Sequence, residues 1–190
     1  MSTLKKLIVA VADSILWVIG RAAKSQFVVG SIRKDSINRK LAKALVKLAP
    51  KDFECDFVKI DDLPIFNQDH DQDPPESVRR VKAQVVASNA FLFVTPEHNR
   101  SLPTALKNVL DWVSRPYGKN LWAGKPGGLA GASIGAIGTA AVTCTSLPAG
   151  NSVQDCCAGK VLHSGTLILD RRNQRCPRLI NSSFGSLLGC

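Results

Sequence analysis

The sequence lacks the short motifs by which many nucleotide-binding and metal-binding proteins are identified. It contains neither the G-x-G-x-x-G dinucleotide fingerprint nor the G-x-x-x-x-G-K-[ST] phosphate loop. This argues against NAD in a Rossmann crevice and against ATP on a Walker loop. Six cysteines are present without a C-x-x-C pair, so we expect no metal site. The absence of a small secreted disulfide framework predicts a cytoplasmic location.

Aromatic residues and long apolar runs are also scarce. Aromatic residues make up 6% of the chain, with Tyr117 as the single tyrosine, and no nucleic-acid-binding module is recognisable. The apolar segment 7–20 is interrupted by Asp13 and is too short to span a bilayer. It resembles a poor signal peptide, but an additional strand or helix, or non-native sequence, is the interpretation we favour. We therefore expect neither nucleic acid nor a membrane as a partner.

What is present is enough for one well-buried domain with a strong positive field. The chain has 190 residues and a mass of 20.4 kDa, which is too short for two comfortable domains. Its formal net charge is +10, from 25 Lys and Arg against 15 Asp and Glu. Such a field attracts nucleotides, oxyanions or nucleic acid without choosing among them.

The most informative stretch is the segment 30–38, between a short apolar strand (27–29) and an amphipathic helix. The first turn of a helix favours an anion. The segment adds hydroxyl, guanidinium and amide donors from Ser31, Arg33, Ser36 and Asn38. On this loop alone, the alternative that Ser36 is a helix cap and Arg33 a solvated charge has equal weight. Because side-chain donors replace glycine-exposed backbone, the pattern points to a single terminal phosphate, such as that of FMN.

From residue 26 to about residue 141 the signals alternate between strand, loop and helix, which predicts a doubly wound α/β sheet. We expect strands near 27–29, 54–60, 89–95 and 127–132, and a buried helix stripe of Ile37, Leu41, Leu45 and Leu48. A second helix is expected to follow Pro74 and Pro75, with Asp73 as its cap. The loops 30–38, 96–101 and 133–138 follow strands whose carboxyl ends share one sheet edge, so we expect them to converge on one site.

Four segments carry a resemblance to a known family: GSIRKDSINRKLAKAL, FLFVTPEHNRSLPTALKNVLDW, SRPYGKNLWAGKP and GASIGAIGTA. Together they resemble the NADPH-dependent FMN reductase family of flavodoxin-like proteins, in its bacterial quinone and chromate reductase branch. The resemblance covers residues 26–141. It implies a five-stranded parallel sheet of order 2-1-3-4-5, although the last strand and closing helix have no clear counterpart in this sequence.

The resemblance also implies which residues hold the cofactor FMN. The FMN phosphate would be held by Ser31, Arg33, Ser36 and Asn38. The loop that lies against the flavin ring and ribityl chain would comprise Pro96, Glu97, His98 and Asn99. His98 stands where the family usually has a tyrosine, so the packing or potential of the flavin would differ. The close-approach loop would be formed by Ser133 and Gly135.

The implied activity is NAD(P)H-dependent reduction of quinones, with chromate or azo compounds as further acceptors, by ping-pong hydride transfer. The flavin would carry the chemistry, so no protein residue is predicted to be catalytic. Arg100 and Arg115 are candidates to attract the NADPH phosphate or an anionic acceptor. The family implies a homodimer or homotetramer. Two alternatives stay open: a flavodoxin-like electron carrier without NADPH turnover, and a non-enzymatic basic binding protein.

The sequence changes character after residue 141. Residues 142–190 contain no Glu and hold five of the six cysteines, and only residues 165–170 resemble a strand. We hypothesise that this tail, and the atypical segment 1–25, depart from the native protein, the tail through a shifted reading frame. A sheet without its last strand and closing helix would leave an edge and part of one face uncovered.

Overall fold

The computed structural model describes residues 24–49, 53–125, 127–134, 139, 161–168 and 179–180. Within these ranges strands and helices alternate along the chain, as the sequence predicts. The elements are β1 (Lys24–Val29), α2 (Ile37–Leu48), β2 (Glu54–Val58), the 3-10 helix η1 (Gln68–His70), α3 (Glu76–Val86), β3 (Ala90–Val94), α4 (Thr104–Ser114), β4 (Gly127–Ser133), β5 (Val161–Ile168) and β6 (Leu179–Ile180).

The strands form one sheet of order β2-β1-β3-β4-β5-β6. Strands β1 to β5 pair in parallel, whereas the short β6 is antiparallel to β5. The predicted flavodoxin-like order 2-1-3-4-5 is therefore confirmed. The segment 165–170, which we expected to be a strand, overlaps the end of β5. The antiparallel β6 at the sheet edge was not predicted.

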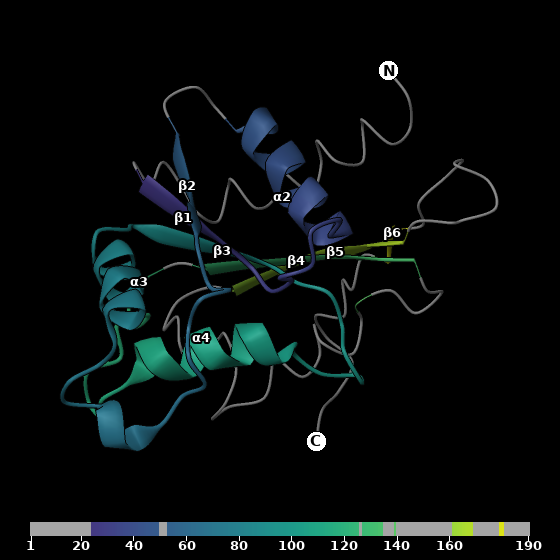
Figure 1. Cartoon of the computed structure of the whole chain (residues 1–190). Coiled ribbons are helices and arrows are strands. Elements are labelled where there is room, and N and C mark those ends of the chain that lie inside the picture. The colour runs from purple at the N-terminus through teal and green to yellow at the C-terminus, as the bar shows by residue number, and fades with distance from the viewer. Residues whose placement is uncertain are drawn as a thin grey trace, which may run out of the picture.

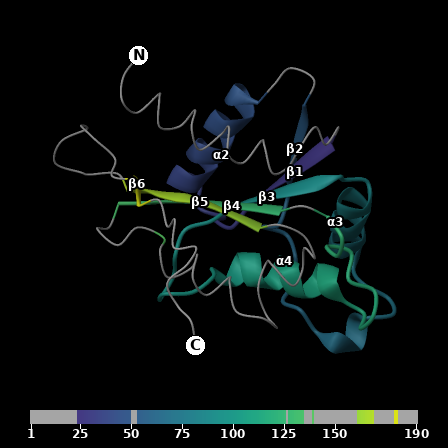
Figure 2. The same cartoon turned by 180° about the vertical axis from the view of Figure 1, so that it is seen from behind.

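Described helices lie on both faces of the sheet, with α2 on one face and α3 and α4 on the other (Figure 1). The view from behind shows the same three layers (Figure 2). Every residue of β3 is buried, because a central parallel strand is covered on both faces. On the α4 side Trp122 packs edge-on against Phe91, with ring centroids 4.7 Å apart. On the α2 side Leu41 and Leu45 pack with Phe27 and Leu92.

Helix α2 begins at the predicted position but buries a slightly different stripe. Its buried residues are Asn38, Leu41, Ala42 and Leu45. Leu48 is 40% exposed, so its predicted burial is wrong, because the packed face of the helix ends one turn earlier. The polar Asn38 is buried instead, for a reason that becomes clear at the site.

Helices α3 and α4 each bury one apolar face against the sheet. Val78, Val81 and Val85 are buried on α3, and α4 buries Leu106, Leu110 and Val113. The predicted cap of α3 is wrong, because Pro75 occupies the N-cap position and makes no side-chain cap bond. The carboxylate of Asp73 pairs instead with the Arg79 guanidinium, at 3.0 Å.

Trp112 belongs to the core on the α4 side of the sheet. It is 1% exposed, and its indole N–H donates to the carbonyl oxygen of Pro64 at 2.8 Å. Among the described residues, the helices are all too short or too polar to cross a bilayer.

Candidate functional site

The loops that follow β1, β3 and β4 enclose one pocket at the carboxyl edge of the sheet. Its volume is about 670 Å³, within the range of small-molecule sites. The predicted site residues that line it are Ser31, Arg33, Ser36, Pro96, Glu97, His98 and Ser133. The loops 30–38 and 96–101 therefore meet here as expected, together with residues 133 and 134, the described part of the third loop. We call this space the cradle pocket.

Gly30 fixes how closely the first loop approaches the sheet. Its N–H continues the sheet ladder by donating to the carbonyl of Val94 at 2.9 Å. A Cβ at Gly30 would lie 2.5 Å from the Thr95 hydroxyl oxygen, closer than real Cβ contacts. Only glycine fits at this position, and its backbone brings the following residues over the end of β3.

Ser36 caps α2 and lines the cradle pocket at the same time. Its Oγ accepts a hydrogen bond from the Arg39 N–H at 3.2 Å, which leaves the hydroxyl proton able to donate. The alternative that Ser36 is a cap is thus correct, and it does not compete with anion binding. Neither the Ser31 hydroxyl nor the exposed Arg33 guanidinium has a side-chain partner among the described residues.

Asn38 does not line the cradle pocket, because its amide is engaged with the backbone of β4. The Asn38 Nδ2 donates to the Ala132 carbonyl at 3.0 Å, and the Asn38 Oδ1 accepts from the Ala132 N–H at 2.8 Å. This two-bond clamp spans 94 residues of sequence. It holds the start of α2 to the end of β4, so two walls of the pocket keep a fixed separation.

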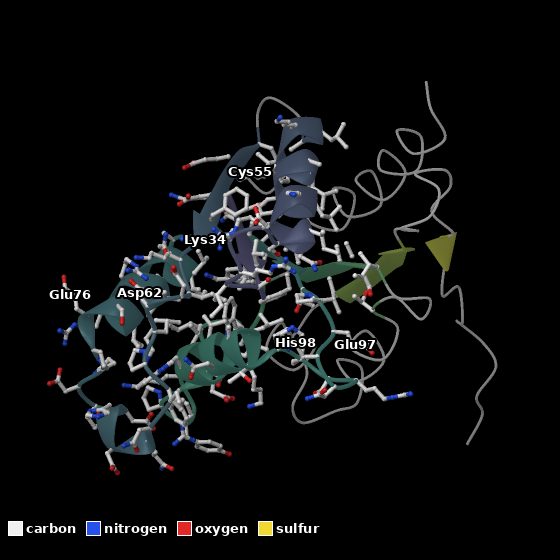
Figure 3. All side chains as sticks on the ribbon, turned by 45° about the vertical axis from the view of Figure 1, so that its right-hand side comes forward. Lys34, Cys55, Asp62, Glu76, Glu97 and His98 are labelled. Carbon is white, nitrogen blue, oxygen red and sulfur yellow. The ribbon has the colours of Figure 1, made fainter. Side chains whose placement is uncertain are left out.

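The loop after β3 contains a tight turn that the sequence did not reveal. His98 and Ser101 exchange two backbone hydrogen bonds, of 3.1 and 2.9 Å. The residues between them have positive φ, 49° at Asn99 and 61° at Arg100, as a type I′ turn requires. Asparagine tolerates this conformation readily, whereas arginine does so rarely. Figure 3 shows Glu97 and His98 beside each other on this loop, well apart from Asp62 and Glu76.

The third wall is the end of β4, where small residues allow close approach. A Cβ at Gly131 would lie 2.6 Å from the carbonyl oxygen of Thr95, so the backbones of the two strand ends lie against each other. Ser133 lines the cradle pocket. Gly135, the other residue predicted here, lies outside the described residues.

Three further predicted residues lie away from the pocket lining. Asn99 and Arg100 form the exposed tip of the turn. The Arg115 guanidinium makes two hydrogen bonds to Asp71, at 3.1 and 2.8 Å. It also lies over the Phe66 ring, with Cζ 5.9 Å from the ring centroid. Arg115 therefore ties the long loop after β2 to the end of α4.

The start of α4 is a part of the site that sequence reasoning missed. Pro103, Thr104 and Ala105 line the cradle pocket, so the N-termini of α2 and α4 both face it. The sequence did contain a signal, since Pro103 lies two residues after the predicted loop 96–101. In this lining the carboxylates of Asp35 and Glu97 outnumber the Arg33 guanidinium, so an anion placed here would depend mainly on the two helix N-termini.

Cys55 is the free cysteine among the described residues, and it does not line the cradle pocket. It lies on β2, and burial raises the pKa of its thiol. A raised pKa disfavours the thiolate, which is the reactive form. In the part of the chain that the structure describes, the site therefore offers no activated cysteine.

The chain matches a known family over most of its length. The model of the family described as NADPH-dependent FMN reductase matches residues 24–168. The flavoenzyme NAD(P)H:(acceptor) oxidoreductase FerB from Paracoccus denitrificans has a similar structure, with a TM-score of 0.68 and 42% sequence identity. That match covers 74% of this chain and 75% of the other.

Two curated relatives are also similar to this chain. A 2-hydroxy-1,4-benzoquinone reductase from a Burkholderia species is 56% identical over 119 residues, 63% of this chain and 65% of that protein. A quinone reductase from Pseudomonas putida is 52% identical over 112 residues, 58% of this chain and 60% of that protein. The chain thus spans less than two thirds of the length of these relatives.

Proposed function

This chain belongs to the NADPH-dependent FMN reductase family, and from that premise we propose that it binds FMN and reduces quinones with NAD(P)H. The observation that carries the proposal is the cradle pocket, in which three loops and the N-termini of α2 and α4 meet around one space. A phosphate placed there meets unpaired backbone N–H groups, which have no partner within their helices. The similarity to proteins named quinone reductases supports the same class of acceptor.

The residues present fit a flavin with a single phosphate. Ser31, Ser36 and Arg33 offer hydroxyl and guanidinium donors at the N-terminus of α2, and charged donors make the strongest hydrogen bonds to phosphate. Asn38 would hold this helix end in place through its two bonds to Ala132. Because Gly30 has no side chain and lies close to Thr95, this part of the pocket would leave space for a ligand.

The remaining walls would receive the flavin ring and the acceptor. His98 and Pro96 would provide flat contacts, and Glu97 and Ser133 polar ones. A bound FMN would supply the redox chemistry of the site, that is, uptake of a hydride from NAD(P)H and transfer of the electron pair to an acceptor. A quinone that takes this pair and two protons, one of them from solvent, leaves as a hydroquinone. Arg100, exposed on its turn, would attract an anionic reactant.

Purification, a flavin spectrum and an NADPH oxidation assay test the proposal. We expect a yellow protein, or one that binds added FMN, whose NADPH oxidation depends on a benzoquinone and gives parallel double-reciprocal plots. Chromate and azo compounds belong in the same assay as further acceptors. Flavin binding without NADPH oxidation would identify an electron carrier. A colourless protein that fails to bind FMN would leave a basic binding protein and overturn the proposal.

The proposal includes a homodimer or homotetramer, as the family resemblance implies, and a cytoplasmic location, as the lack of a secreted disulfide framework predicts. Sedimentation analysis of the purified chain measures its assembly directly. A monomer that still turns over NADPH would remove the oligomer from the proposal and leave the activity in place.

A further inference from the structure

A second pocket lies beside the cradle pocket, between the end of β2 and α2. Its volume is about 320 Å³, and we call it the β2-side pocket. Its apolar lining consists of Val29, Ile32, Phe57, Val58 and Ile60, and its charged lining of Arg39, Lys43, Lys59 and Asp61. Ile32 lines both pockets, so the two are neighbours on the same edge of the sheet.

The charged lining carries two cations that the described part of the protein leaves unpaired. Lys59 is paired with Asp62 at 3.3 Å. Arg39 and Lys43 make no side-chain hydrogen bond or ion pair among the described residues. They are four residues apart on α2, so their side chains are neighbours and repel each other. An anion held between them would relieve that repulsion.

The apolar part of the lining is partly open to solvent. Ile32 is 58% exposed although it is a large aliphatic residue, and the aromatic ring of Phe57 also lines the space. A lining that combines apolar residues with two cations suits a ligand that joins a phosphate to a flat ring, because the ring can be buried and the phosphate can form ion pairs.

The size of the pocket limits which part of a nucleotide it can hold. Ligand pockets span about 300 to 1,000 Å³, so a space of about 320 Å³ is at the small end. It is too small for a whole dinucleotide, but it suits one nucleoside phosphate. NADPH differs from NADH by a single phosphate on the adenosine ribose. Its 2′-phosphoadenosine end is therefore a nucleoside phosphate of the size that this pocket can hold.

We propose that the β2-side pocket binds the 2′-phosphoadenosine end of NADPH, and that Arg39 and Lys43 select NADPH over NADH. The inference rests on the proposed function, since it assigns the co-substrate of that same site. Arginine presents a planar fork of donors to phosphate, while lysine adds a point charge. Their spacing on α2 places both on one side of the same group.

Calorimetric titration of the full chain with 2′,5′-ADP and with 5′-AMP tests the inference without any turnover. We expect 2′,5′-ADP to bind at least about tenfold more tightly. Arg39→Gln and Lys43→Gln should each lose about tenfold in 2′,5′-ADP affinity and leave 5′-AMP binding unchanged. Lys40→Gln and Lys47→Gln, exposed positions on the same helix that do not line the pocket, are the matched controls.

Three results would overturn the inference. One is equal affinity of the wild type for the two nucleotides, and another is equal loss in the control variants. The third is inorganic phosphate or FMN competing fully with 2′,5′-ADP, because the bound group would then be a free anion or would occupy the cradle pocket.

A kinetic arm separates this inference from the proposed function. With a quinone acceptor, Lys43→Gln should raise the KM for NADPH about tenfold and leave the KM for NADH unchanged. If the wild type turns over both nucleotides and the variant keeps the same preference, only the inference fails. If the wild type oxidises neither, the proposed function fails, and the 2′,5′-ADP titration still decides whether the pocket binds this group.

Discussion

Two loops begin at the same edge of the sheet and differ in whether their polar and charged side chains have partners within the protein. In the loop after β1, Ser31 and Arg33 have no side-chain partners among the described residues and line the cradle pocket. In the longer loop after β2, Asp62, Asp71 and Asp73 each pair with an arginine. Polar groups satisfied within the protein hold the fold, whereas unsatisfied groups around a pocket are available to a ligand.

The loop after β2 is anchored at several points along its length. The Arg80 guanidinium donates two hydrogen bonds to the Asp62 carboxylate, both of 2.8 Å. Further along, the Asn108 side chain accepts from the Phe66 N–H and donates to the Pro64 carbonyl, each at 2.8 Å. This loop therefore has a structural explanation for its charges that the loop after β1 lacks.

The largest expected effect comes from breaking the most buried ion pair of the loop after β2, that between Asp71 and Arg115. The Asp71 and Arg115 side chains are only 10% and 25% exposed. Asp71→Asn should lower the free energy of unfolding by about 2 to 3 kcal/mol without changing FMN affinity. Urea denaturation and FMN titration measure the two quantities. Asp73→Asn, in an exposed pair, is the control and should change stability by about 0.5 kcal/mol or less. Equal stability of the two variants would contradict this assignment.

An intermediate effect should appear in the loop after β1, and in ligand affinity rather than stability. Arg33→Gln removes a cation that lines the cradle pocket and has no partner in the described part of the chain. We expect FMN to bind about tenfold more weakly, or about 1.4 kcal/mol, with an unchanged unfolding midpoint. Lys34→Gln, next in sequence and absent from the pocket lining, serves as the control. A lower midpoint for Arg33→Gln with unchanged FMN affinity would reverse the comparison.

The smallest expected effect is a pH dependence of stability that comes from Asp62, near the start of the loop after β2. The hydrogen bonds from Arg80 hold the pKa of Asp62 well below its usual range. A depressed carboxyl pKa stabilises the fold above the pKa of the unfolded chain, near about 3.9. The stability difference between wild type and Asp62→Asn, about 1 kcal/mol or less for this partly exposed pair, should be present at pH 6. It should shrink as the pH falls below about 4. A difference that grows in acid would contradict this.

The sequence predicted the fold well because the fold depends on patterns that repeat. Continuous apolar runs identify β3, and Val78, Val81 and Val85 identify the packed face of α3. The order of the strands followed from the family resemblance and is confirmed. The exposure of Leu48 could not be predicted, because helical periodicity does not tell where a neighbouring sheet ends.

The site was predicted at the level of loops more than of individual contacts. The described parts of the three loops meet as expected, since parallel strands share one carboxyl edge. The clamp between Asn38 and Ala132 joins positions 94 residues apart, and no local sequence pattern predicts a contact between such distant positions. The ion pair of Asp71 with Arg115 was missed for the same reason, since an acidic loop by itself reads as a solvated connection.

The segments 1–25 and 142–190 remain a separate prediction, since most of their residues lie outside the described ones. Under the hypothesis of a shifted reading frame, mass spectrometry of the natural protein should give a mass different from that of the 190 residues. A mass matching all 190 would end the hypothesis.

The comparison between the two loops is tested most directly by FMN titration of Arg33→Gln and Arg115→Gln side by side with the wild type. Both changes remove one guanidinium, and only Arg33 lines the cradle pocket. We predict an affinity loss of about tenfold for Arg33→Gln and none for Arg115→Gln. Equal losses in both variants, or a wild-type chain that binds no FMN, would contradict the account.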